Sequence, residues 1–108
     1  MGSFIQVVTT AAERSDAEKI AKTLVEKRLA GCVQIVGPVT STYRWKGWVE
    51  QSQEWQCLIK TRQDLYSELE EVIKEIHPYE TPEIIAIPLV AGCRDYLDWL
   101  GDALRKAG

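Results

Sequence analysis

Apolar and polar residues along this chain follow a two-residue period in some stretches and a helical period in others. The run FIQVVTT at 4–10 is apolar and β-branched, and it predicts a buried strand. The next segment predicts an amphipathic helix, because its apolar residues recur at helical spacing. They are Ala17, Ile20, Ala21, Leu24 and Val25. Ser15 and Glu18 form a capping box that would open this helix, and Gly31 would end it.

Two long strands are predicted next, at 32–45 and 48–61, with a chain reversal at Lys46-Gly47 between them. Gly37-Pro38 interrupts the first of them, and since proline cannot donate to a ladder, we expect a bulge or an edge position there. The second strand alternates between an apolar and a more polar face. The first face carries Trp55, Cys57 and Ile59, and the second carries Glu54, Gln56, Leu58 and Lys60.

A second helix is predicted after a cap between Thr61 and Asp64, and it should end at about His77, because Pro78 disfavours helical geometry at the residue before it. Its apolar positions are Leu65, Leu69, Val72, Ile73 and Ile76. A last strand follows at 83–90.

Pro88 within that strand indicates a sheet edge. Asp95 would cap a final helix with an apolar face. That face carries Tyr96, Leu97, Leu100, Ala103 and Leu104.

The element order is therefore β-α-β-β-α-β plus a C-terminal helix, the α+β arrangement called ferredoxin-like. Right-handed crossovers would place the two main helices on one face of a four-stranded antiparallel sheet. We find no repeat or linker, and we assign residues 1–108 to a single domain.

The long hairpin predicts an obligate oligomer. Strands of about 13 residues reach about 43 Å, whereas a domain of this size has a radius of gyration of only about 13 Å. The tip would overshoot its own core, and its rings would become anchors at an interface. Those rings belong to Tyr43, Trp45, Trp48 and Trp55. The alternative is a hairpin folded back at Pro38 onto its own domain.

Composition excludes several classes of function. The net charge is -3, and the 13 Lys and Arg residues are scattered, so we expect no nucleic-acid partner. No apolar run approaches the roughly 20 residues of a membrane span, and no signal peptide is visible. Three widely spaced cysteines indicate free thiols in a reducing compartment. We therefore expect a cytoplasmic protein with no membrane partner.

Five sequence blocks, taken in order and spacing, resemble the CutA family of divalent-cation tolerance proteins. They are AGCVQI at 30–35, S-x-Y-x-W-x-G at 41–47, Glu54, LIKT at 58–61 and HPYETPEI at 77–84. The resemblance covers nearly the whole chain. It implies a homotrimer of ferredoxin-like subunits, similar in architecture to the trimeric PII signalling proteins. It also implies a role in tolerance to copper and other divalent metals.

The resemblance suggests Cu(II) or another divalent metal as a ligand, with His77 and Cys32 as candidate ligating residues. Some family members carry a cysteine late in the first strand and a histidine pair before the Pro-Tyr. Here those positions hold Thr9 and Ile76, so only His77 remains. Two alternatives stay open. His77 is also typical of a helix C-terminus, hydrogen-bonded to nearby carbonyls, and Cys32 is also typical of core packing. No organic cofactor is indicated.

The charged and aromatic members of the same blocks predict a cleft between subunits for a small ligand. The predicted lining is Tyr43, Trp45, Glu54, Lys60, Tyr79, Glu80 and Glu83. Two alternatives remain here as well: Lys60 and one Glu could form an ion pair between subunits, and the rings could pack at the interface.

These features together predict a cytoplasmic homotrimer of the CutA type that acts in metal tolerance as a binding or signalling module. We expect no enzymatic activity, since the chain lacks a nucleophile elbow and a phosphate-binding glycine loop. The alternatives are a PII-like sensor of a small metabolite and a structural trimeric adaptor.

Overall fold

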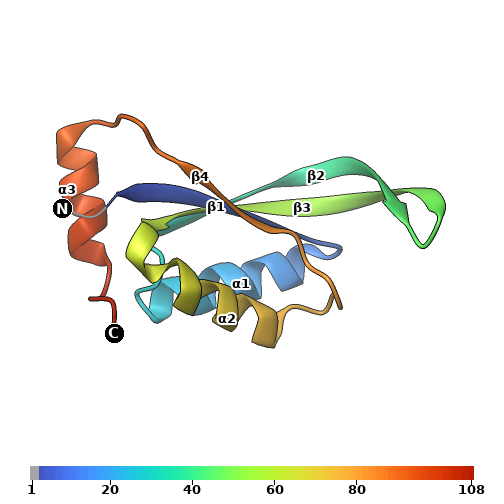
Figure 1. Cartoon of the computed structure of the whole chain (residues 1–108), viewed down its shortest axis with the longest axis horizontal. Coiled ribbons are helices and arrows are strands. Elements are labelled where there is room, and N and C mark those ends of the chain that lie inside the picture. The colour runs from blue at the N-terminus through green and yellow to red at the C-terminus, as the bar shows by residue number, and fades with distance from the viewer. Residues whose placement is uncertain (1–2) are drawn as a thin grey trace.

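A computed structural model describes residues 3–108 as one four-stranded antiparallel sheet with three α-helices (Figure 1). The α+β class and the element order β-α-β-β-α-β plus a helix are confirmed. In chain order the elements are β1 (Phe4–Ala11), α1 (Arg14–Glu26), β2 (Cys32–Trp45), β3 (Trp48–Arg62), the short 3-10 helix η1 (Gln63–Leu65), α2 (Tyr66–Ile76), β4 (Ile84–Pro88) and α3 (Arg94–Ala103).

The sheet has the strand order β2-β3-β1-β4, so β1 lies inside and β4 forms an edge. Val7 of β1 pairs with Ile59 on one side and with Ala86 on the other. Pro88 pairs with Ile5 at the edge strand, as predicted, because a proline there forfeits no ladder bond. The strand β4 is shorter than the predicted 83–90, because the chain leaves the sheet after Pro88 to reach α3.

The predicted interruption at Gly37-Pro38 is a β-bulge. Val36 pairs with Gln56, and the next pair joins Val39 to Glu54, so β2 holds one extra residue there. A Cβ atom at Gly37 would lie 2.7 Å from the ring of Trp55, which leaves no room for a side chain. Glycine is therefore required where the two strands approach each other.

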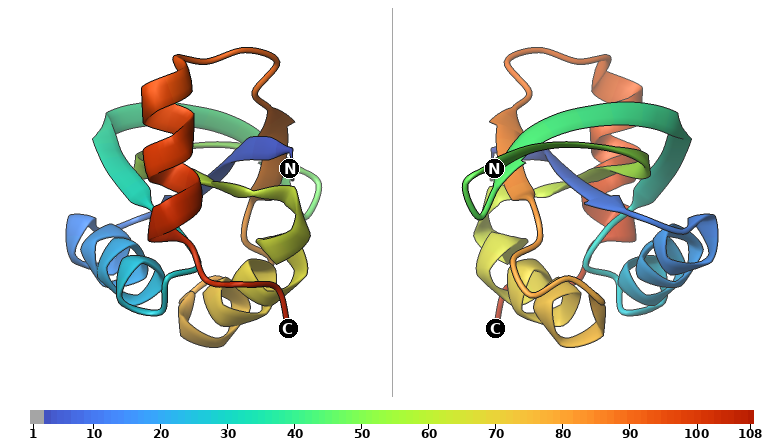
Figure 2. Two further views of the ribbon diagram at one scale, coloured as in Figure 1. Left: turned by 90° about the vertical axis from the view of Figure 1, so that its left-hand side faces the viewer. Right: turned by 90° about the vertical axis from the view of Figure 1, so that its right-hand side faces the viewer.

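The helices α1 and α2 lie side by side under one face of the sheet, and α3 stands across the end of the sheet (Figure 2). The space between the sheet and the two helices is filled by aliphatic side chains. The largest fully buried ones are Ile20, Leu24, Leu29, Ile59, Leu65, Leu69, Ile73, Leu100 and Val7. The apolar stripe of α1 is narrower than predicted, since Val25 is exposed.

The predicted capping box at Ser15 and Glu18 is wrong. The helix α1 begins at Arg14, its N-cap residue is Glu13, and no side chain caps it. Ser15 therefore lies inside the first turn, and Glu18 instead forms an exposed ion pair with Arg14. The helix begins three residues after the end of β1 at Ala11, and the local capping motif does not contain that information.

The side-chain caps expected at 61–64 and at Asp95 are also wrong. Thr61 is fully buried and donates its hydroxyl to the Leu29 carbonyl at 2.6 Å. Asp64 is bonded to the Arg62 guanidinium at 2.7 Å. The helix α3 starts one residue before Asp95, which therefore lies within its first turn. Thr61 thus has a tertiary partner, Asp64 has a partner two residues away, and Asp95 has the wrong position in the turn.

The turn after α1 is made by Arg28 rather than by Gly31. Arg28 adopts a left-handed conformation with φ of 59°. Its side chain donates to the carbonyls of Asp102 and Ala103 at 2.7 and 3.0 Å, at the negative end of α3. Gly31 serves a different purpose, because a Cβ atom there would lie 2.5 Å from Leu100 Cδ1.

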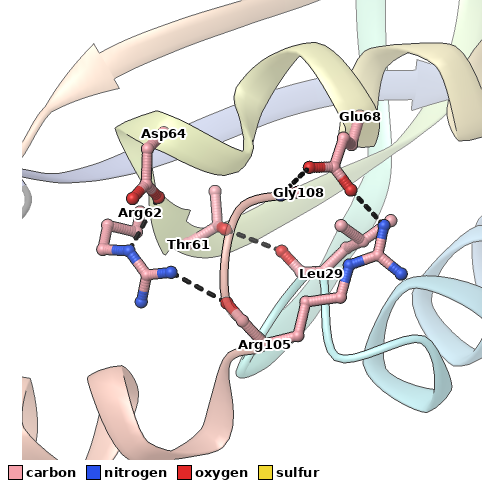
Figure 3. Close-up of polar contacts among 7 residues, drawn as sticks. All are labelled: Leu29, Thr61, Arg62, Asp64, Glu68, Arg105 and Gly108. Carbon is pink, nitrogen blue, oxygen red and sulfur yellow. Dashed lines mark hydrogen bonds and ion pairs between the residues drawn. The ribbon is translucent and has the colours of Figure 1, made fainter.

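The segment after α3 runs back to the helix layer and is held by a set of polar contacts (Figure 3). Glu68 of α2 pairs with Arg105 and accepts a bond from the Gly108 backbone N–H at 3.1 Å. The Arg105 carbonyl accepts from Arg62 at 2.8 Å, and its N–H donates to the Arg28 carbonyl. The Gly108 hydrogen bond, followed by Arg105, lowers the pKa of Glu68.

The hairpin of β2 and β3 projects well beyond the helices (Figure 1). The molecule measures 44 × 26 × 22 Å with a radius of gyration of 14.3 Å. Lys46 and Gly47 make the predicted reversal with φ of 50° and 86°, and Trp48 beside them is 73% exposed. The predicted overshoot is confirmed, and the hairpin does not fold back at Pro38. We call residues 39–54 the arm and the rest of the sheet with α1 and α2 the body.

Candidate ligand cleft

A cleft lies where the arm meets the segment that joins α2 to β4, and it encloses about 830 Å³. All of the predicted cleft residues except Lys60 line it. They are Tyr43, Trp45, Glu54, Tyr79, Glu80 and Glu83. Two segments far apart in the sequence therefore meet around one cavity, and they do so within a single chain rather than only between chains.

Strand alternation brings the arm residues to the same side. Tyr43 lies opposite Glu50, and two positions further along Ser41 lies opposite Ser52. Side chains at every second position share a face, so these pairs and Glu54 follow one another along the hairpin. The Tyr43 hydroxyl and the Ser52 hydroxyl are 3.2 Å apart and form a hydrogen bond. The arm thus contributes one polar and aromatic wall.

Glu54 and Tyr79 join the two walls. The Tyr79 hydroxyl donates to Glu54 Oε2 at 2.8 Å, and Glu54 is only 8% exposed. Burial and the Glu54 carboxylate raise the pKa of Tyr79, with smaller contributions from Tyr43 and Asp16. The Tyr79 hydroxyl therefore keeps its proton and remains a hydrogen-bond donor at neutral pH. Among residues 3–108, no cationic side chain forms an ion pair with Glu54.

His77 is buried behind this wall, with both ring nitrogens in use. Its Nε2 lies 2.7 Å from the Thr10 carbonyl, and its Nδ1 accepts the Tyr79 backbone N–H at 3.1 Å. A carbonyl can only accept, so the proton is on Nε2 and the lone pair of Nδ1 is occupied. Pro78 holds His77 in extended geometry, which ends α2 and aims the ring at β1. This arrangement fits the alternative from the sequence in which His77 ends a helix and is hydrogen-bonded to a nearby carbonyl, rather than the metal ligand.

Cys32, the other predicted metal ligand, lies at a different end of the sheet. Through its partner Lys60 on β3, Cys32 lies level with Gln6 of β1. His77 is bonded to Thr10, which is four residues further along β1. That offset alone is about 13 Å at roughly 3.3 Å per residue. Within the described residues, no group of three or more His, Cys, Asp or Glu side chains could hold a metal ion. His77 and Cys32 do not form a metal site within one chain.

The surroundings of Cys32 are instead those of a packed thiol. It is half-buried at the start of β2, beside Tyr96 of α3. Burial and the neighbouring Cys32 raise the pKa of Tyr96. Cys57 is fully buried in the core, where burial raises the pKa of its thiol to about 11. Cys93 is exposed.

Lys60 lies outside the cleft. Its ammonium donates to the Gln34 side-chain oxygen at 3.0 Å, on β2. Glu54 is six residues away along β3, about 20 Å at strand spacing. Lys60 therefore does not line the cleft of its own chain, and its place in a cleft between subunits stays a prediction. Within residues 3–108, Lys60 makes no ion pair with a glutamate.

The tryptophans predicted at a subunit interface have different environments. Trp55 packs partly buried against the core, and the Arg14 guanidinium lies 5.2 Å from its ring centroid. Trp45 lines the cleft, with the Lys46 ammonium 5.6 Å from its ring centroid. Trp48 is the most exposed of the three.

Sequence reasoning missed several lining residues. They are Thr10, Ser41, Thr42, Glu50, Pro78, Thr81 and Pro82. Alternation across the hairpin would have found Glu50, since it faces Tyr43. Thr10 could not be found in this way, because it lies on β1, and only the pairing of β1 with β3 places it beside the cleft.

The fold and the cleft define a class: a small α+β protein with a projecting hairpin arm and an acidic, aromatic cavity at its base. The sequence model of the family described as "CutA1 divalent ion tolerance protein" matches residues 5–103. The chain therefore belongs to the CutA family of divalent ion tolerance proteins.

Individual relatives agree with this assignment. The chain is 49% identical over 94 residues to the divalent-cation tolerance protein CutA of Thermus thermophilus, covering 87% of this chain and 91% of that protein. It is 39% identical over 99 residues to the human protein CutA, covering 92% of this chain but only 55% of that protein.

Solved structures share the fold along nearly the whole chain. The Thermus thermophilus protein has a TM-score of 0.92 at 45% identity, covering 94% of this chain and 99% of that one. CutA1 from Oryza sativa has a TM-score of 0.94 at 35% identity, covering 97% and 96%. Another, from Archaeoglobus fulgidus, is described as a periplasmic divalent cation tolerance protein (TM-score 0.92, 37% identity, covering 94% and 99%).

Proposed function

We propose that this chain acts in divalent-cation tolerance as a binding module, with the cleft as its ligand site and a homotrimer as its working form. The observation that carries the proposal is the Glu54–Tyr79 pair in a cavity of about 830 Å³. Ligand sites are typically cavities of this size with aromatic walls and a few fixed polar groups. A buried carboxylate with a single neutral partner is costly, and a ligand that supplies a further donor would offset that cost.

A binding role fits the cleft better than catalysis does. The single histidine offers no free ring nitrogen, because Thr10 and Tyr79 occupy both. Tyr79 has a raised pKa and acts as a fixed donor rather than as a base. We therefore assign no catalytic residue.

The homotrimer is supported by the exposed apolar surface. The tip residues Trp48 and Val49 are exposed, and so are Ile85 and Ile87 on the open face of the sheet. Surface of this kind is a liability in a monomer and an asset in an assembly. A PII-like trimer, with arms lapping over neighbouring subunits, would cover it.

A direct role for Cu(II) or another divalent metal needs groups from more than one copy. His77 and Cys32 do not meet within one chain, and His77 has no free lone pair. Three copies would bring further ligands together only at their interfaces. A cytoplasmic location is supported by the three free cysteines, a typical state for a reducing compartment. Within residues 3–108, no helix is long and apolar enough to cross a membrane.

The alternative of a PII-like sensor is less well supported for an anionic metabolite such as a nucleotide. Four glutamates line the cleft, and among the lining residues of the described chain there is no lysine or arginine. An adaptor with no ligand remains the second alternative, favoured by the exposed tip residues.

Three measurements test the proposal. Light scattering coupled to gel filtration should give about three times 12.2 kDa, and a monomer peak would refute the trimer. Trp45→Ala should weaken assembly more than it lowers the unfolding free energy of the subunit.

Calorimetric titration of the metal-free protein with Cu(II) and Zn(II) tests direct binding. His77→Ala and Cys32→Ser should each weaken uptake if these residues are ligands, and neither will if the metal acts elsewhere.

A further inference from the structure

The cleft carries a concentration of negative charge that the chain does not neutralise. Its four carboxylates belong to Glu50, Glu54, Glu80 and Glu83. In the part of the chain that the structure describes, none of the four forms an ion pair. Like charges held together in this way attract cations and raise their local concentration.

One of these carboxylates is built into the wall rather than displayed on the surface. Glu54 is 8% exposed, and its Oε2 accepts the Tyr79 hydroxyl. Its other oxygen receives no hydrogen bond within residues 3–108, yet it is not sealed from solvent. Glu54 therefore keeps one acceptor open toward the cleft, and a carboxylate forms its strongest hydrogen bonds with charged donors.

The aromatic walls fit the same kind of partner. Tyr43, Trp45 and Tyr79 line the cleft, and ring faces attract ammonium groups, tryptophan more strongly than tyrosine. The chain itself supplies an example, since the Lys46 ammonium lies 5.6 Å from the Trp45 ring centroid. An amine that entered the cleft would find rings for its methylenes and carboxylates for its charge.

The spacing of the carboxylates distinguishes an extended cation from a single ion. No three acidic, His or Cys side chains among the described residues are close enough to hold one metal ion. The cavity, at about 830 Å³, is also far larger than one ion needs. We propose that the cleft binds an extended organic cation, an aliphatic polyamine whose ammonium groups pair with Glu54 and the outer glutamates. This inference rests on the cleft being the ligand site of the proposed function.

Calorimetric titration of the full-length protein with spermidine tests the inference. Matched titrations use 1,8-octanediol, a neutral chain of similar length, and ATP, an anion. Glu54→Gln removes the buried charge but keeps an acceptor for Tyr79, and Glu83→Gln removes an outer charge. Glu75→Gln on α2 is the control, since this exposed residue does not line the cleft but changes the net charge equally.

We expect saturable binding of spermidine and none of the diol. Glu54→Gln should weaken binding about tenfold, as loss of one charge-assisted hydrogen bond predicts. Glu83→Gln should weaken it less, and Glu75→Gln should leave it unchanged. Tryptophan fluorescence should change with the same midpoint as the heat, because Trp45 lines the cleft.

Several results would overturn the inference. Equal weakening by Glu54→Gln and Glu75→Gln would show general surface attraction, and equal binding of the diol would show a merely apolar cavity. Binding of ATP without spermidine would keep the cleft as the ligand site and reject the polyamine. Absence of all binding in the assembled protein would reject the cleft as a ligand site, because a second copy covers it or no ligand enters it. If Cu(II) still bound, metal binding would then stand without the cleft.

Discussion

The body and the arm share the strands β2 and β3, but the residues of these strands have opposite environments in the two regions. In the body, Cys57, Ile59 and Thr61 of β3 are fully buried against the helices. In the arm, Trp48 and Val49 of the same strand are 73% and 67% exposed. The change occurs near Trp55, the first residue of β3 that pairs with β1. One strand therefore carries buried core residues at one end and exposed apolar residues at the other.

The largest expected effect separates the two regions by stability. Ile59→Ala should lower the free energy of unfolding by about 2–5 kcal/mol, because it leaves a cavity in a closely packed core. Val49→Ala is the matched aliphatic truncation in the arm and should change it by less than about 0.5 kcal/mol in the subunit. Urea unfolding, followed by circular dichroism, measures both. Similar losses for the two variants would mean that the arm is as tightly packed as the body.

The next effect tests the contact between the body and α3. A Cβ atom in Gly31→Ala would meet Leu100 Cδ1 at 2.5 Å, so we expect a loss of about 1–3 kcal/mol from overpacking. Gly101→Ala is the control, because its Cβ would meet only Phe4 at an ordinary 3.6 Å. That change should be neutral or stabilising, since alanine favours a helix by about 1 kcal/mol. A neutral Gly31→Ala would show that Leu100 can move aside.

A smaller effect tests the junction at the cleft. Tyr79→Phe removes the hydroxyl that Glu54 accepts, and an unsatisfied buried acceptor costs about 1–3 kcal/mol. Tyr43→Phe loses only the exposed bond to Ser52 and should cost much less. Thermal unfolding compares the two variants. An equal cost for both would contradict the special role given to the buried pair.

The smallest effect concerns pH. Glu68 has a lowered pKa in the folded protein, so the unfolded chain binds more protons as the solution is acidified. Its contribution to stability is therefore present above about pH 4.5 and is lost as the pH falls through the lowered pKa. Unfolding free energies of the parent protein and of Glu68→Gln, measured from neutral pH downward, should converge in this acid range. Curves that stay parallel would exclude Glu68 as the source.

The sequence predicted the elements of the fold well, because period and length are local properties. The strand at 32–45, the bulge at Gly37-Pro38 and the end of α2 before Pro78 all depend on neighbouring residues. The cap at Thr61 could not be predicted, because its hydroxyl donates to the Leu29 carbonyl, which only the folded chain brings close. Asp64 instead pairs with Arg62, two residues before it. Local motifs fail where a tertiary bond competes for the same side chain.

The sequence identified several of the residues that line the cleft, but it did not show which of the candidate residues lie together. Tyr43, Glu54 and Tyr79 were identified through the family resemblance, and the structure gathers them in one cleft. His77 and Lys60 came from the same blocks, yet His77 lies behind the wall and Lys60 lies elsewhere on the sheet. A block of sequence groups residues by spacing along the chain, whereas the register of the sheet decides which of them share a cavity.

The left-handed turn at Arg28 also has a consequence for the order of events during synthesis. Its side chain holds Asp102 and Ala103, which lie more than seventy positions later in the chain. Leu100 and Leu104, also late, fill the same core as Leu29. A ribosome that has made the sheet and both main helices has therefore produced an open core and an arginine without its acceptors. We expect the body to become resistant to proteases only when α3 has emerged and docked.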